Sequence, residues 1–178
     1  MRLNLIQPSG VNKMIQLQNP LPKVRLAIGA LSLAGLFLMS QAQAGIVKID
    51  PDAKAVEVIN QTLTALETAN EASRIQMLEK LLHKSMLGPG GKGLDPSVQR
   101  FSYKKAVQNA QFYKNPVEIY EVHQGNVSTV GFKTTAEKGR RDKYFIQKKE
   151  GVAGRPAPVH IFWPDNGSAP KVLDFGSL

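Results

Sequence analysis

The chain has 178 residues, with 23 Lys and Arg against 14 Asp and Glu, and it contains no cysteine. The absence of cysteine excludes disulfides, thiol nucleophiles and cysteine-based zinc sites, so the fold has to depend on its hydrophobic core. The formal net charge of the whole chain is +9, and the N-terminal leader described next contributes four of these charges.

The N-terminal segment, residues 1–44, has the three-part pattern of a secretory signal peptide. A leader with four basic residues and no acidic one precedes the apolar run Leu26–Met39, and Ala42-Gln43-Ala44 is a small-residue cleavage motif. Since a membrane-spanning helix needs about 20 apolar residues, this run is too short to be one. We therefore predict cleavage after Ala44 and one periplasmic or secreted domain from Gly45 to Leu178. Met14 is an alternative start of the same leader.

Three helices are predicted in the first part of this domain. Asp50-Pro51 has the capping residue and the first-turn proline of a helix start, and apolar residues then recur at spacings of three and four. Residues 51–86 form either one long helix or two helices joined near residues 68–70, and we favour two, with the second beginning at Asn70-Glu71. A glycine-rich loop, Gly88–Gly93, separates it from a third helix that begins at Asp95-Pro96 and reaches about Tyr113.

From Pro116 onward, short runs of β-branched and aromatic residues alternate with turn residues. The turns expected between the first three strands are Gln124-Gly125-Asn126 and Glu137-Lys138-Gly139. The predicted sheet is an antiparallel meander of strands over residues 117–123, 127–134, 141–148, 158–163 and 171–175. The predicted fold class is therefore α+β, with two or three N-terminal helices packed on a curved antiparallel sheet of four to five strands.

This order of elements, from Pro51 to Leu178, resembles the cone-like, cystatin-like α+β domain of the nuclear transport factor 2 superfamily. The final strand pair, Val159–Trp163 and Lys171–Phe175 around a turn, contributes to the resemblance. Members usually have a strand between the second and third helices, where this chain has the glycine loop. The resemblance implies a pocket between the concave face of the sheet and the helices. It does not select a function, because the fold hosts enzymes, ligand carriers and assembly subunits.

Three side chains are candidates for acid–base chemistry in such a pocket. Strand alternation places Ile119, Glu121 and His123 on one face, and Val172 and Asp174 on one face of the last strand. If these faces point inward, Glu121, His123 and Asp174 are the candidate catalytic residues. The alternative is that they lie at the margin of the sheet in water. The three histidines, His83, His123 and His160, belong to separate elements, so we expect no metal site and no cofactor.

Six basic residues cluster along one predicted hairpin and form the candidate binding surface. Without the leader, 19 basic and 14 acidic residues remain, a net charge of +5. Such a surface suits an acidic protein partner or an anionic envelope component, whereas an exported protein is not expected to bind nucleic acid. The alternative is a solvated edge that discourages strand pairing. The six residues are Lys138, Arg140, Arg141, Lys143, Lys148 and Lys149.

The sequence therefore favours an exported, non-enzymatic binding or envelope-assembly protein, and its oligomeric state stays open. One alternative is a carrier of a lipid or another apolar ligand in the interior of the cone. A second is a small hydrolase or isomerase that uses the three candidate residues. If the leader is not cleaved, its basic end holds it as a membrane anchor, and the protein then resembles the single-span assembly subunits of type IV secretion systems.

Overall fold

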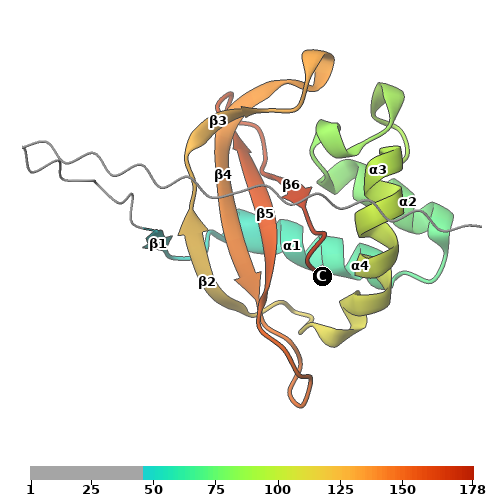
Figure 1. Ribbon diagram of the computed structural model, residues 1–178, viewed down its shortest axis with the longest axis vertical. Helices are drawn as coiled ribbons and strands as arrows, with labels where there is room; N and C mark the ends of the chain where they lie inside the picture. The colour runs from blue at the N-terminus through green and yellow to red at the C-terminus, as the bar shows by residue number, and fades with distance from the viewer. Residues whose placement is uncertain (1–45) are drawn as a thin grey trace, which may run out of the picture. The chain divides into compact units, whose positions relative to one another are not determined.

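The computed structural model describes residues 46–178, which form helices packed on one face of a curved, open antiparallel sheet (Figure 1). This arrangement confirms the predicted α+β class. The predicted signal peptide and its cleavage site after Ala44 lie outside the described residues. Within residues 46–178, none of the helices has the length and apolar character needed to cross a bilayer.

The first two helices are α1 (Ala53–Glu67) and α2 (Glu71–Leu81). Helix α1 is capped by Asp52, whose carboxylate accepts the Lys54 N–H, so the helix begins two residues later than the Asp50-Pro51 pair predicted. Asn70 caps α2 by accepting the Ser73 N–H, as a polar residue at this position does. The favoured prediction of two helices is confirmed, although α2 ends at Leu81 rather than near residue 86.

The third helical region is continuous but irregular. It follows the short 3₁₀ turns η1 (Lys84–Met86) and η2 (Pro89–Gly91), and Asp95 caps it by accepting the Ser97 N–H. Its segments are α3 (Pro96–Val98), a π-helical stretch (Gln99–Tyr103), α4 (Lys104–Asn109) and a 3₁₀ turn (Ala110–Phe112). The predicted helix from residue 96 to 113 therefore exists, with a π-type widening inside it.

The described sheet has six strands, one more than predicted. Their order is β1-β2-β4-β5-β6, and β3 pairs with β4 beyond the end of β2. The additional strand, β1, is a three-residue strand at one edge of the sheet. The strands are β1 (Val47–Ile49), β2 (Ile119–Gln124), β3 (Val127–Val130), β4 (Glu137–Ile146), β5 (Ala157–Pro164) and β6 (Lys171–Asp174).

The predicted hairpin between residues 117–123 and 127–134 is wrong, because Gln124-Gly125-Asn126 does not reverse the chain. Strands β2 and β3 continue in the same direction, and both pair antiparallel with the long strand β4. At the joint, Gly125 approaches β4 so closely that a Cβ atom on it would lie 1.7 Å from the Arg141 carbonyl oxygen. A glycine at this point makes a close backbone contact rather than a turn.

The second predicted turn is also displaced. Glu137-Lys138-Gly139 lies inside β4, and the chain reverses over residues 131–136 through a 3₁₀ turn (Lys133–Thr135). Gly131 and Lys133 have positive φ angles of 85° and 51° there. Gly139 again serves a close contact, because a Cβ atom would lie 2.6 Å from the Phe162 ring. Both errors come from assigning a chain reversal to glycines that instead permit close packing.

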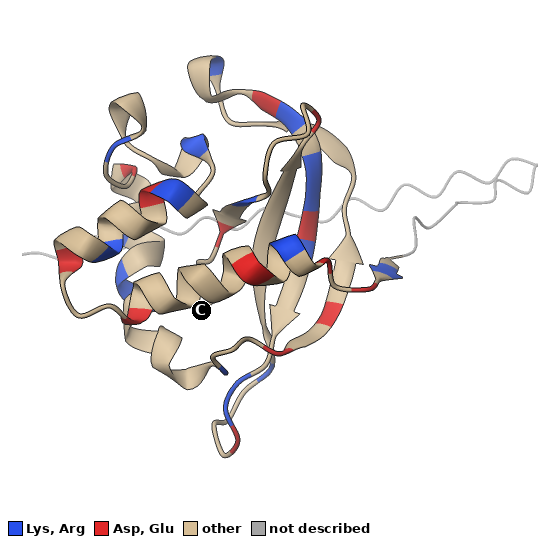
Figure 2. Ribbon diagram, turned by 180° about the vertical axis from the view of Figure 1, so that it is seen from behind, with Lys and Arg blue, Asp and Glu red and all other residues tan. Residues whose placement is uncertain are grey.

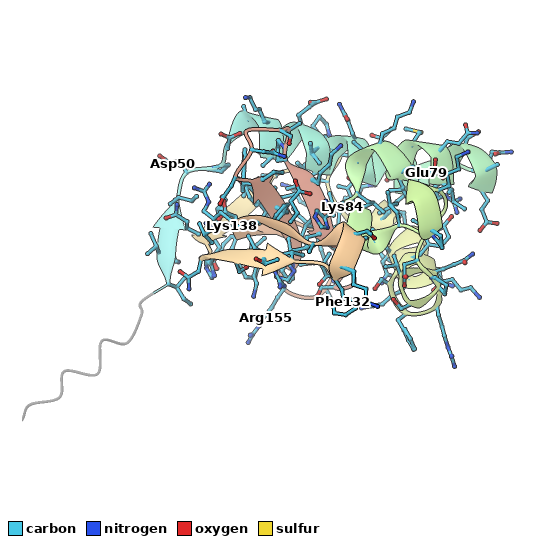
Figure 3. The ribbon with its side chains drawn as sticks, turned by 90° about the horizontal axis from the view of Figure 1, so that it is seen from above. Asp50, Glu79, Lys84, Phe132, Lys138 and Arg155 are labelled. Atoms are coloured by element: carbon cyan, nitrogen blue, oxygen red, sulfur yellow. The ribbon has the colours of Figure 1, made fainter. Side chains whose placement is uncertain are left out.

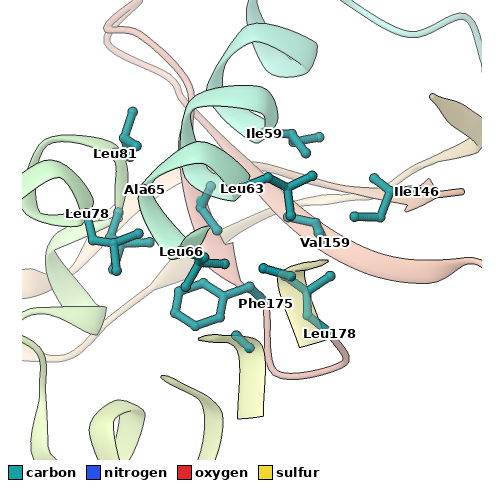
Figure 4. Packing of buried hydrophobic residues seen from close by; sticks show 14 of the residues in the cluster. Ile59, Leu63, Ala65, Leu66, Leu78, Leu81, Ile146, Val159, Phe175 and Leu178 are labelled. Atoms are coloured by element: carbon teal, nitrogen blue, oxygen red, sulfur yellow. The ribbon is translucent and has the colours of Figure 1, made fainter. Parts of the chain in front are cut away.

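The core fills the space between helix α1 and the sheet (Figure 4). Ile59, Leu63 and Leu66 of α1 pack with residues of β4 and β5 and with the C-terminal Phe175 and Leu178. Each such fully buried side chain contributes about 1.5–3 kcal/mol relative to an exposed one. The region in which the fold resemblance implies a pocket is therefore occupied by the protein's own side chains. The two central strands contribute Tyr144, Ile146, Val159 and Ile161 to this core.

Candidate functional site

The sheet face opposite α1, here called the outer face, carries a row of charged and polar residues from five strands. Adjacent members of the row are direct register partners, and partners in antiparallel strands place their side chains on the same face. The neighbouring residues on the row's inner side are apolar core residues such as Val122 and Tyr144. The outer-face row consists of Lys48, His123, Lys143, His160 and Asp174.

Two β-bulges direct the predicted candidates to this face. In β2 the register shifts between Ile119 and Glu121, so Tyr120 is an extra residue and Ile119 packs on the core while Glu121 points outward. A second shift between β5 and β6 separates Val172, which is buried in the core, from Asp174, which is opposite His160. The predicted pairs Ile119–Glu121 and Val172–Asp174 therefore do not share a face, because a bulge interrupts the alternation.

Glu121 joins two members of the row. Its Oε2 lies 2.6 Å from Lys48 Nζ, and its Oε1 lies 3.0 Å from His123 Nε2. The hydrogen bond from Lys48 lowers the pKa of Glu121, and the same bond raises the pKa of Lys48. The His123 ring also packs on Phe145, with ring centroids 4.7 Å apart. This side of the row is therefore charged but internally neutralised.

Asp174 and His160 form the second carboxylate–histidine pair, with Oδ2 and Nδ1 3.2 Å apart. The hydrogen bond with His160 lowers the pKa of Asp174, so Asp174 is anionic. Arg141 Nη2 lies 3.2 Å from the same Nδ1 atom. The proton position on the ring decides which of these two contacts is a hydrogen bond, because Nδ1 donates to Asp174 when it is protonated and accepts from Arg141 when it is not.

An open groove of about 760 Å³ lies over the row, beside the joint between β2 and β3. It contains the cations Arg141 and Lys143 and the two histidine rings, and no acidic residue lines it. Ser128 and Asn126 add uncharged donors. We call it the basic groove. Its lining residues are Ile46, Val47, His123, Gln124, Gly125, Asn126, Ser128, Arg141, Lys143 and His160.

The six basic residues predicted to form one surface are divided between different environments, although basic residues do follow one another along β4 (Figure 2). Arg140 points to the inner side, where its Nε and Nη2 atoms bind the fully buried carboxylate of Asp142 at 2.9–3.1 Å. Its guanidinium also lies 5.7 Å from the centre of the Trp163 ring. Arg140 thus neutralises a buried charge, and Arg141 and Lys143 line the groove.

The remaining three basic residues lie elsewhere. Lys138 is exposed near the end of the β3–β4 hairpin, 3.6 Å from Asp165 (Figure 3). Lys148 and Lys149 follow β4, and Lys148 donates to the Ala153 carbonyl at 2.8 Å. These residues do not line the basic groove. The predicted set therefore contributes two of its members, Arg141 and Lys143, to this site.

The third histidine, His83, lies apart from the row. It is 1% exposed, and its ring packs edge-on against Phe162 at 4.8 Å between centroids. Its Nδ1 accepts the Ser85 N–H, and its Nε2 lies 3.5 Å from Glu137 Oε2. Burial lowers the pKa of His83. Within residues 46–178, no group of three His, Cys, Asp or Glu side chains has a geometry that could hold a metal ion.

The chemistry of the row is that of oriented charges. A carboxylate beside an imidazole orients the ring. In the described part of the chain, neither His123 nor His160 makes a hydrogen bond to a serine or threonine hydroxyl. The two pairs also lie on an open face rather than in a closed cavity. This arrangement suits the recognition of an anion better than nucleophilic catalysis.

Comparison with known proteins gives no relative: the chain matches no family model, no curated protein and no solved structure. The resemblance to the nuclear transport factor 2 superfamily therefore rests on the order of elements alone.

Sequence reasoning missed Lys48 and the role of His160. Lys48 lies in the unpredicted strand β1, and His160 was considered only as a metal ligand. Alternation within residues 158–163 correctly separates His160 from the buried Val159 and Ile161. What the sequence does not contain is the register that brings His160 opposite both Lys143 and Asp174.

Proposed function

We propose that the protein is an exported, non-enzymatic binding domain whose basic groove holds acidic side chains of a partner protein. The observation that carries this proposal is the groove itself, which combines Arg141, Lys143, His123 and His160 and has no acidic residue in its lining. The carboxylates next to it, Glu121 and Asp174, are engaged by Lys48, His123 and His160. An acidic segment would therefore meet Arg141 and Lys143, neither of which forms an ion pair within residues 46–178.

Two alternatives have less support. An apolar ligand in the interior would have to displace fully buried side chains such as Leu63, Leu66 and Phe175, at the cost of their packing. A hydrolase or isomerase would need a nucleophile or a substrate held against the candidate acids and bases. Glu121, His123 and Asp174 instead lie on an open face, and each already has a charged or ring partner in the row.

The proposal is tested by titrating isotope-labelled protein with a short polyglutamate peptide and following backbone amide shifts. We expect the shifts to concentrate at residues of the groove and the affinity to fall with increasing salt, because exposed charges are screened. The double variant Arg141→Glu, Lys143→Glu should lose binding. Replacing two exposed lysines outside the groove, Lys92→Glu and Lys104→Glu, makes the same change in net charge and serves as the control.

Equal loss of binding in both double variants would mean that only net charge matters and would overturn the proposed site. The export part of the proposal has its own measurement. The intact mass of the protein recovered from the periplasm of a bacterial expression host should correspond to a chain that begins at Gly45. A chain that retains the leader would favour the membrane-anchored alternative.

A further inference from the structure

The edge of β3 that faces away from β4 lies beside the basic groove. Strand β3 pairs with β4 through Val127–Val130, and β1 pairs only with β2, where Val47 is opposite Gln124. Within residues 46–178, no strand pairs with the second edge of β3. An edge strand of this kind presents backbone donors and acceptors to an incoming chain.

The backbone groups that point outward can be identified from the neighbouring strand. The Lys138 carbonyl accepts the Asp165 N–H at 3.0 Å, so the polar backbone groups of Lys138 point toward β5. Lys138 and Thr129 are therefore a pair without mutual hydrogen bonds, and Thr129 directs its N–H and C=O away from β4. Val127, two residues earlier, does the same.

The side chains of β3 alternate between the basic groove and the opposite side of the sheet. Ser128 is opposite Gly139, which shares the outer face with Arg141, and Ser128 lines the basic groove. Val127 and Thr129 project to the other side, where Val127 is 53% exposed. A strand added to this edge would therefore place every second side chain beside the groove and the others beside exposed apolar and hydroxyl groups.

We propose that β3 is a strand-addition site, at which an acidic, extended segment of a partner protein pairs with Val127 and Thr129. Its outward-facing Asp or Glu side chains reach Arg141 and Lys143, and β-branched residues alternate with them. Strand addition of this type takes affinity from main-chain hydrogen bonds and specificity from alternate side chains. The inference rests on the proposed function, because the acidic chemistry of the partner follows from the groove.

Charge selects this occupant over a second copy of the chain. Two copies paired through β3 would bring two basic grooves together, and like charges placed opposite each other are destabilising. The segment Val127–Val130 itself contains no acidic residue. An acidic strand has neither disadvantage.

The test compares two labelled peptides of the same composition, measured with the full-length protein by fluorescence polarisation. One alternates Glu with Val or Thr, and the other carries its glutamates in one block. We expect the alternating peptide to bind at least about tenfold more tightly than the blocked peptide. A tenfold difference in affinity corresponds to the net contribution of about one main-chain hydrogen bond. Thr129→Pro removes the outward N–H at an edge position that tolerates proline. This substitution should lower the affinity for the alternating peptide to that for the blocked peptide.

A second measurement needs no substitution. The amide protons of Val127 and Thr129 should become protected from hydrogen exchange when the alternating peptide binds, whereas those of Ser128 and Val130 should change little. Equal affinities for the two peptides, without this protection, would overturn strand addition and leave the proposed function standing. If neither peptide binds, the proposed function fails as well. Peptide-independent dimers that lose stability in Thr129→Pro would assign the edge to a second copy instead.

Discussion

The two faces of the sheet are built from the same strands but by different means. The inner face presents Tyr144, Val159 and Ile161 to helix α1, and its buried carboxylate, Asp142, is held by Arg140. The outer face keeps its charges near solvent and pairs them across adjacent strands. Stability therefore depends mainly on the inner face, and substitutions on the outer face should affect binding with little effect on folding.

The largest difference in stability between the two faces is expected when two neighbouring arginines are substituted. Arg140→Glu removes the partner of the fully buried Asp142 and adds a second negative charge. Because an unpaired buried carboxylate is unfavourable, the free energy of unfolding should fall by about 3 kcal/mol. Arg141→Glu, one residue away on the outer face, should change it by less than about 0.5 kcal/mol.

Urea denaturation of the two variants makes this measurement. The partial exposure of the Arg140 side chain is the reason to expect the lower end of the range for a broken buried pair. Equal destabilisation by the two substitutions would contradict the conclusion that stability depends mainly on the inner face.

An intermediate effect is expected at the joint between β2 and β3. Gly125→Ala places a Cβ atom against the Arg141 carbonyl, a backbone group that cannot rotate away. The backbones have to separate, which should cost about 1–3 kcal/mol and weaken the hydrogen bond from the Gly125 N–H to Asp142. Thermal unfolding measures the loss. Gly151→Ala is the control without a clash, because a Cβ atom there meets nothing within 4 Å. Gly151 has a positive φ of 78°, unlike Gly125, and its substitution should still cost less.

The smallest effect concerns His83, a titratable group buried against the outer face. Its pKa in the folded protein is lowered by burial from the ordinary value of 6.5. Its contribution to stability is therefore complete above about pH 6.5 and is lost as the pH falls toward the lowered pKa. His83→Asn keeps an acceptor for the Ser85 N–H, and it should flatten this part of the pH dependence.

The informative quantity is the slope of unfolding free energy against pH between about pH 7 and pH 5, rather than its level at one pH. An unchanged slope in His83→Asn would show that another group titrates on unfolding in this range.

Local sequence signals predicted the elements of this fold better than their pairing. The spacing of Ile59, Leu63 and Leu66 predicted α1 and the face it buries, and Asn70 and Asp95 predicted two helix starts. These signals act within one or two helical turns. Strand pairing depends on residues far apart in the chain, and no local pattern shows that β3 pairs with β4 rather than with β2.

For the same reason, only part of the candidate site could be predicted from the sequence. Glu121, His123 and Asp174 were identified by their chemistry, and they do lie with other charged residues. Their face was not predictable, because one extra residue at a bulge moves every later side chain of the strand to the other side. The basic residues illustrate the same point. Arg140 and Arg141 are adjacent arginines in the sequence, but in the structure they lie on opposite faces of the sheet.

The outer-face row has a consequence for how specificity can change over time. It takes one residue from each of five strands, and no member belongs to the hydrophobic core. Each position can therefore be exchanged separately without a compensating change in the fold. Under the proposed function, single substitutions in such a surface can change its binding preference, and the same five positions can be redesigned together.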